Sequence, residues 1–91
     1  MHGEYKVPGG KLVVVDCELE DDKVRRPQVS GDFFLEPAEA LAEISQALDG
    51  VPADLGEQAI ADRIRAVLSD DVQMIGFSPE AVAVALRRAL A

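Results

Sequence analysis

The chain has 91 residues, of which 17 are acidic and 9 are basic, so its formal net charge is −8. A chain of this length predicts one domain, residues 1–91, with a hydrophobic core but no room for a deep internal active site. The charge argues against nucleic acid as a partner, because binding phosphates requires clustered Lys and Arg side chains.

The sequence also bears on where the protein works. Its single cysteine, Cys17, cannot form an internal disulfide and is typical of a reducing compartment. No apolar run approaches the roughly 20 residues that a membrane span requires, and residues 1–10 lack the apolar stretch of a signal peptide. We therefore expect a cytoplasmic protein that does not enter membranes.

Residues 11–20 alternate apolar and polar side chains, which predicts a half-buried strand. The side chains expected on its buried face are Val13, Val15, Cys17 and Leu19. Asp21, Asp22 and Lys23 then predict a hairpin turn, because Asp accepts a positive φ. The second strand, residues 24–30, should pair antiparallel with the first. Pro27 lacks an N–H, so this strand lies at an edge or its nitrogen faces outward.

A third extended segment follows at residues 31–37, with Phe33 and Leu35 on one face and Phe34 on the other. Pro37 suits the first turn of a helix. That helix stops near Gly50, and its apolar stripe consists of Leu41, Ile44 and Leu48, with Ala40 and Ala47 beside them.

The rest of the chain predicts two more helices. The second is marked by the spacing of Ile60, Ile64, Val67 and Leu68 and ends at residues 69–71. Residues 72–75 fit either an extended piece or a helical turn. The third helix begins with Ser78 as N-cap and Pro79 as first residue, and Glu80 lies near its positive end. Its inward side chains are Val82, Leu86 and Ala89 or Leu90. Arg87 and Arg88 lie at its carboxyl end, where cations are favoured. The predicted class is α+β, a small three-stranded antiparallel sheet followed by about three helices packed on one face.

Few residues could carry chemistry. Cys17 shares a face with buried valines, so we interpret it as a small core residue rather than a sulfur carrier or metal ligand. The only histidine, His2, is expected in a loose terminus without a second ligand nearby. No catalytic set such as Ser-His-Asp can be assembled, and no metal site is predicted.

Residues 6–11 place Gly9 and Gly10 between Lys6 and Lys11. Such a loop could offer backbone N–H groups and positive charge to an anion. It leads into a strand rather than a helix, however, and it lacks the longer phosphate-loop pattern. A hairpin turn is the favoured interpretation.

Three segments together carry a resemblance to a known family. They are residues 6–12 (KVPGGKL), 29–37 (VSGDFFLEP) and 76–80 (GFSPE), and SGDFF is the most specific part. Across nearly the whole chain the sequence resembles the accessory (C-terminal) domain of lipoate-protein ligase, in the form of a separate small subunit.

The resemblance implies a fold related to iron–sulfur scaffold and sulfur-acceptor domains. It also implies a non-catalytic accessory subunit that works with a catalytic subunit to make lipoyl-AMP from lipoate and ATP. The lipoyl group would then pass to lipoyl domains of 2-oxoacid dehydrogenases or to the glycine-cleavage H protein. Lipoate, ATP and Mg²⁺ are expected in the catalytic partner and none on this chain, which has no counterpart of that partner's Arg-rich glycine motif or catalytic lysine.

The residues expected to bind the catalytic subunit are Lys6, Gly9, Gly10, Lys11, Gly31, Asp32, Phe33 and Phe34. Phe33 and Phe34 are adjacent and cannot both point into one side of a sheet, so one of them is free to contact a partner. Two alternatives stay open: a sulfur-transfer or iron–sulfur assembly protein that uses Cys17, and an interaction domain unrelated to lipoate.

Overall fold

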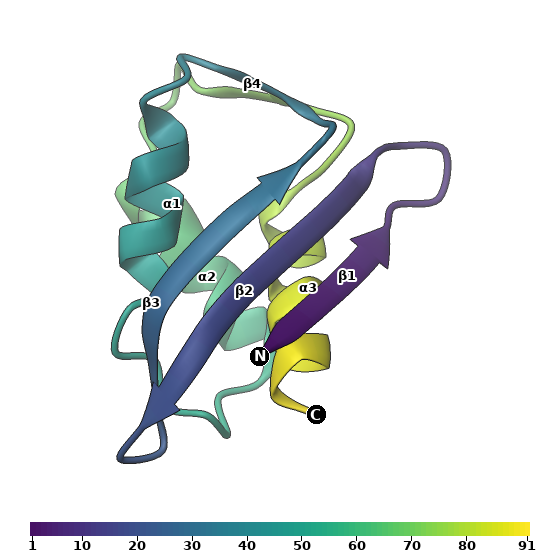
Figure 1. The fold of residues 1–91 in the computed structure, drawn as a ribbon. Helices are drawn as coiled ribbons and strands as arrows, with labels where there is room; N and C mark the ends of the chain where they lie inside the picture. Colours follow the sequence, from purple (N-terminus) through teal and green to yellow (C-terminus); the bar gives the residue numbers. More distant parts are fainter.

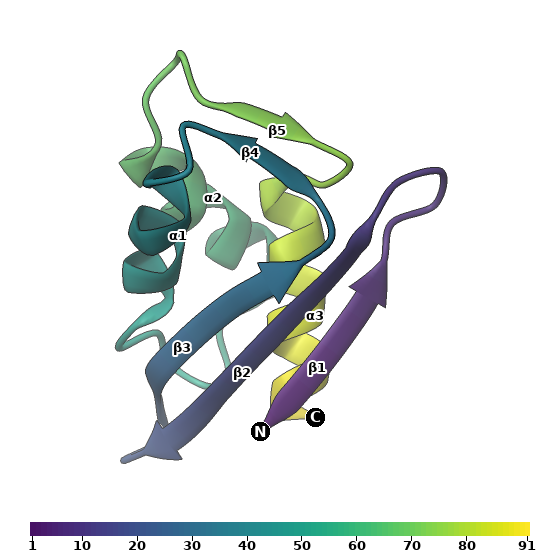
Figure 2. The same ribbon diagram turned by 45° about the horizontal axis from the view of Figure 1, so that its top comes forward.

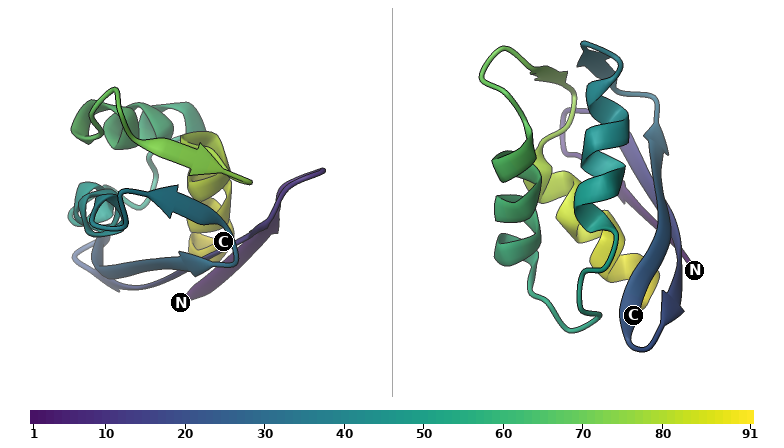
Figure 3. Two further views of the ribbon diagram at one scale, coloured as in Figure 1. Left: turned by 90° about the horizontal axis from the view of Figure 1, so that it is seen from above. Right: turned by 90° about the vertical axis from the view of Figure 1, so that its left-hand side faces the viewer.

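A computed structural model describes all residues, from Met1 to Ala91, as two small antiparallel sheets and three helices (Figure 1). The larger sheet consists of β1 (His2–Lys6), β2 (Leu12–Glu20) and β3 (Lys23–Gly31), in that order, and the smaller of β4 (Phe34–Glu36) and β5 (Gln73–Ile75). The helices are α1 (Ala40–Leu48), α2 (Glu57–Val67) and α3 (Pro79–Leu90). They lie on one side of the larger sheet, which confirms the predicted α+β class (Figure 3).

The β2–β3 hairpin has the predicted turn. Asp21 and Asp22 have φ angles of 55° and 60°, and the strands pair on either side of them. Both central residues of a tight hairpin turn need a positive φ, which Asp tolerates better than most residues. The prediction that Leu19 is buried was wrong: its side chain is 36% exposed, because the hairpin tip extends beyond the helices (Figure 1).

A β-bulge in β3 keeps two valines in the core. Val24 and Val29 are both buried although an odd number of positions separates them. The bulge places Arg26, with a φ of 52°, and Pro27 opposite the single residue Cys17, and so it restores the inward face. Of the two alternatives that Pro27 left open, the structure shows an edge strand, and Pro27 lies in its bulge.

The third strand of the larger sheet is β1, which the sequence analysis did not predict. Gly3 pairs with Val15 and Tyr5 with Val13. The extended segment that follows Gly31 instead pairs with residues 73–75, which are therefore extended. His2 is likewise not in a loose terminus, because it opens β1 and both of its ring nitrogens form hydrogen bonds.

Helix α3 packs against β1 at Gly3. A Cβ atom at this position would lie 2.2 Å from the Ala85 oxygen and 2.3 Å from the Ala89 nitrogen. Because real Cβ contacts are never so short, only glycine permits this approach of helix and strand. Val82 and Leu86 of α3 are fully buried and Ala89 nearly so, as predicted.

The helix boundaries differ from the predicted ones mainly at α1. This helix begins at Ala40, whose N–H donates to the Pro37 oxygen at 3.1 Å, so Pro37 precedes the helix rather than lying in its first turn. Val67 ends α2 and is 43% exposed, so its expected inward position was wrong. Ser78 caps α3 as predicted, because its Oγ accepts the Ala81 N–H at 3.2 Å.

The two ends of the chain lie at the same end of the larger sheet, at the start of β1 and the end of α3 (Figure 1). The Met1 ammonium donates to the Cys17 oxygen at 2.7 Å, which fixes the first residue against β2. None of the three helices is long and apolar enough to cross a lipid bilayer.

Candidate functional site

Three segments that are far apart in the sequence meet at the other end of the molecule (Figure 2). The Lys11 N–H donates to the Gly76 oxygen at 2.8 Å, and the Leu12 N–H donates to Asp32 Oδ1 at 2.8 Å. We call this region, residues 6–12, 31–34 and 75–77, the three-segment corner. It unites the same stretches of sequence that carry the family resemblance.

The first segment of the corner is a hairpin turn between β1 and β2, as the sequence analysis favoured. The Val7 N–H donates to the Lys11 oxygen at 3.0 Å, and Gly9 has a φ of 72°. The Lys6 ammonium donates to the oxygens of Gly10 and Val7 inside the turn, so it stabilises the loop itself. Of the two lysines, Lys11 is therefore the one whose ammonium has no bond within the protein.

The Lys11 side chain lies over Gly76. Gly76 has a φ of 88°, and a Cβ atom there would come within 2.5 Å of Lys11 Cγ. Glycine is thus required both by the backbone and by the stem of the lysine. The stem of Lys11 therefore contacts the residue that directly follows β5.

The second segment contains the two phenylalanines, which have different environments. The Phe33 ring is half-buried and stacks on Phe77, with centroids 3.8 Å apart and an angle of 21° between the planes. The Phe34 side chain is 55% exposed. Phe33 therefore stabilises the corner from inside, whereas Phe34 is available for contact from outside.

The β4–β5 ribbon places a second exposed apolar side chain beside Phe34. Phe34 pairs with Ile75, which is 56% exposed, while Leu35 and Met74 pair on the inward side. Sequence reasoning missed Ile75, because residues 72–75 gave no clear signal and only the pairing places it beside Phe34. Large apolar side chains that face water in adjacent strands are characteristic of interaction surfaces.

Gly31 and Asp32 hold the second segment against β2. Gly31 has a φ of 152°, and a Cβ atom there would lie 2.1 Å from the Leu12 oxygen. All of the predicted partner-binding residues therefore lie in the three-segment corner. Gly9 lies in its first segment, where a Cβ atom would meet nothing within 4 Å.

Cys17 lies in the core with 5% of its surface exposed. Burial is the main reason that the pKa of its thiol is raised above its usual value. A protonated, buried thiol is a poor nucleophile, which argues against the sulfur-transfer alternative.

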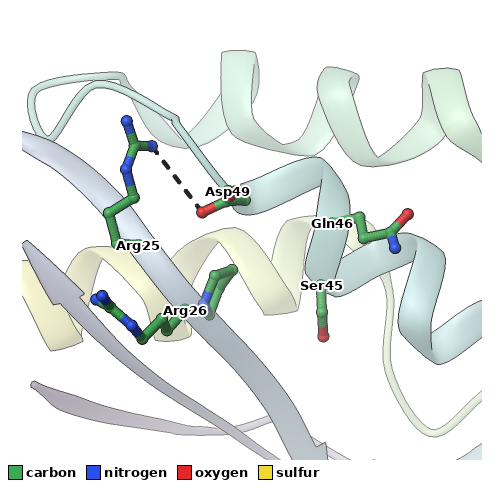
Figure 4. Close-up of a pocket in the computed structure, with 6 residues that line it drawn as sticks. Arg25, Arg26, Ser45, Gln46 and Asp49 are labelled. Atoms are coloured by element: carbon green, nitrogen blue, oxygen red, sulfur yellow. Dashed lines mark ion pairs between the residues drawn. The ribbon is translucent and has the colours of Figure 1, made fainter.

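The rest of the surface holds no further concentration of reactive groups. His2 Nδ1 lies 2.6 Å from Asp16 Oδ1 and His2 Nε2 lies 2.6 Å from Glu4 Oε2, so its nitrogens face separate carboxylates and do not converge on a common point. No group of three His, Cys, Asp or Glu side chains could hold a metal ion. A polar hollow of about 390 Å³ lies between β3 and α1, where Arg25 Nη1 is 4.0 Å from Asp49 Oδ1 (Figure 4).

Comparisons with known proteins add one relationship. No protein-family model matches the sequence, and no curated protein matches it. The chain is similar to a chain in a structure described as an archaeal lipoylation system, a bi-partite lipoate protein ligase and its E2 lipoyl domain from Thermoplasma acidophilum. The TM-score is 0.72, the sequence identity is 28%, and the match covers 96% of this chain and 98% of that chain. The protein is thus similar, over almost its whole length, to a component of a lipoylation system.

Proposed function

We propose that this chain is the non-catalytic accessory component of a two-part lipoate-protein ligase. In the activation step a lipoate carboxylate oxygen attacks the α-phosphorus of ATP, forming lipoyl-AMP and releasing pyrophosphate. A lysine amine of the acceptor protein then displaces AMP to form an amide. The acceptors are lipoyl domains of 2-oxoacid dehydrogenases or the glycine-cleavage H protein.

The observation that carries the proposal is the similarity to a chain of nearly equal length in a system whose ligase is bi-partite. A chain of this size, without a deep pocket or a catalytic set of side chains, fits the smaller part of such a ligase better than the part that performs the chemistry. Lipoate, ATP and Mg²⁺ would then be bound by the catalytic component.

The three-segment corner is the surface that we assign to the catalytic component. Phe34 and Ile75 offer two adjacent apolar side chains, and Lys11, whose stem contacts Gly76, offers a cation in the same corner. Buried aromatic anchors with a polar rim are the features that dominate binding energy at protein interfaces. Docking there would help to exclude water from lipoyl-AMP, a mixed anhydride that water hydrolyses.

The direct test is lipoate-dependent exchange of pyrophosphate into ATP, with the organism's own catalytic component in the presence and absence of this chain. We expect activity that requires both proteins. Full activity of the catalytic component alone, with no complex detected, would refute the proposal.

Matched variants locate the surface. Phe34→Ala and Ile75→Ala should each weaken the complex at least tenfold, because each removes an exposed apolar anchor. Val67→Ala is the control, since Val67 is also an exposed apolar residue but lies at the end of α2. Equal binding by all three variants would show that another surface is used.

Two further readouts separate this proposal from its rivals. The intact mass of this chain should not change during the full reaction. A lipoyl adduct on one of its own lysines would make it an acceptor instead. Rapid labelling of Cys17 in the folded protein would contradict its burial and would favour the sulfur-transfer alternative.

A further inference from the structure

Helix α1 lies alongside the free edge of β3 (Figure 1). A groove between the two is lined by residues of both elements. It consists of three adjoining hollows of about 330, 450 and 390 Å³ that share lining residues. The residues common to neighbouring hollows are Ser30, Ala38, Leu41 and Ser45. The groove is apolar next to Phe33 and Phe34 and polar next to Arg25.

The edge of β3 offers backbone groups to this groove. In β2, Cys17 directs its N–H to the Met1 oxygen on the β1 side. Alternation along an antiparallel strand then directs the even-numbered residues of β2 to β3, where they bond Gln28 and Ser30. The N–H and C=O groups of Val29 and Gly31 consequently point outward, and neither residue forms a backbone hydrogen bond outside the sheet.

The other half of the same edge shows how such groups are satisfied. The outward N–H of Val24 donates to the Val51 oxygen at 2.9 Å, and its oxygen accepts the Gly50 N–H at 2.7 Å. The chain thus adds its own extended segment beside Val24 but stops before Val29. Because the N–H and C=O groups of an edge strand can pair with another chain, the second half of the edge is suited to an added strand.

At the polar end of the groove, the Arg25 guanidinium has N–H groups that donate no hydrogen bond. Arg25 is half-buried and donates one hydrogen bond to the Val24 oxygen at 3.2 Å. Its contact with Asp49, at 4.0 Å, is too long for a hydrogen bond (Figure 4). Arg26, in contrast, is held by Glu18 at 3.2 Å and Glu20 at 3.6 Å. A carboxylate that enters the groove would therefore meet free donors on Arg25.

We propose that the groove binds an extended peptide segment of a partner protein, which adds a strand antiparallel to β3. The segment is about six residues long, because it would pair with residues 25–31 of β3, of which one is the extra residue of the bulge. Antiparallel pairing places an apolar side chain of its first residues near Leu41 and a carboxylate at its last residue on Arg25. Backbone bonds to Val29 and Gly31 supply affinity, and the two ends of the groove supply selectivity. This inference does not depend on the role in lipoylation.

The probe is a displayed library of random hexapeptides with free carboxyl termini, selected on the wild-type chain. We expect enriched peptides that are apolar at their start and acidic at their end. Ala42→Leu places a larger side chain in the groove and should weaken their binding at least tenfold. Ala59→Leu is the control, because it makes the same change at an exposed position of α2.

Amide hydrogen exchange provides an independent readout on the wild-type chain. The Val29 and Gly31 amides should exchange faster than those of Gln28 and Ser30 in the free protein. An enriched peptide should slow them at least tenfold, and N-methylation of its pairing amides should abolish that effect. Arg25→Gln should weaken binding about fivefold without changing exchange in the free protein.

Three results would overturn the inference. The first is a library without enriched sequences, and the second is equal binding of enriched peptides by Ala42→Leu and the wild type. The third is a wild-type dimer in light scattering that Ala42→Leu converts to a monomer, because a second copy of the chain would then occupy the edge.

Discussion

Two regions at the margin of the core use their side chains in opposite ways. They are the contact between α3 and β1 and the β4–β5 ribbon. At the first, glycine and alanine let backbones meet so closely that a methyl group cannot enter. At the second, Leu35 and Met74 turn inward while Phe34 and Ile75 turn two large side chains to water. The first arrangement stabilises the fold, whereas the second leaves apolar side chains exposed for contact with another molecule.

The difference teaches where to look for function in a domain without a catalytic set. Most of the largest fully buried side chains lie in the larger sheet and in the three helices, whereas Phe34 and Ile75 of the ribbon face water. Substitutions should therefore separate into those that unfold the protein and those that only change binding.

The largest expected effect lies in the layer beneath the sheet. Leu86→Ala removes a fully buried side chain of α3 and should lower the free energy of unfolding by about 3 kcal/mol. Urea denaturation followed by circular dichroism measures the change. A loss below about 1 kcal/mol would contradict this expectation and would show that the core collapses around the cavity.

Gly3→Ala tests the close approach directly. The added methyl group would collide with backbone atoms of Ala85 and Ala89, so we expect a loss of about 2 kcal/mol. Gly56→Ala is a control, because a Cβ atom there meets nothing within 4 Å and its φ is negative. The control should change stability by less than about 1 kcal/mol. Equal melting temperatures for the two variants would contradict the packing described here.

The adjacent phenylalanines compare a half-buried and an exposed environment at neighbouring positions of the chain. Phe33→Ala loses the stack on Phe77 and should cost about 1.5 kcal/mol of stability. Phe34→Ala should cost less than about 0.5 kcal/mol, because its side chain is mostly in water. Thermal unfolding of both variants measures the two losses of stability. A large loss of melting temperature for Phe34→Ala would show that it belongs to the core.

The smallest effect concerns His2. Hydrogen bonds that the His2 ring donates to the carboxylates of Glu4 and Asp16 raise the pKa of His2 above its usual value of 6.5. Since the charged ring is favoured in the folded state, its contribution is complete below pH 6.5 and is lost as pH rises through the folded pKa. Ring titration by NMR should give a pKa above that of a model peptide. His2→Gln should remove the corresponding pH dependence of stability, and a normal pKa in the wild type would contradict the paired geometry.

The sequence was sufficient for elements whose signal is local. Alternation predicts β2, paired acids predict its turn, and Ser78 with Pro79 predicts the start of α3. The inward positions of β1, in contrast, are Gly3 and Tyr5, and glycine carries no hydrophobic signal. Position 3 requires glycine because of its contact with helix α3, which lies more than 80 residues later in the chain.

The candidate site could be predicted only in part for the same reason. The SGDFF stretch drew attention to Phe34, but nothing near Ile75 in sequence marks it as a neighbour. Likewise, period-two alternation cannot place both Val24 and Val29 inside, because the bulge at Arg26 depends on pairing with β2. Long-range pairing therefore decides both the site and the groove.

The placement of the two chain ends has a practical consequence for experiments. Both lie at the end of the larger sheet that is opposite the three-segment corner (Figure 1). A fluorophore, affinity handle or fused reporter attached there would stand clear of that surface. The carboxyl end is the better anchor, because a fusion at the amino end would replace the ammonium that holds Met1 on Cys17. Immobilised through its last residue, the molecule would present the corner outward.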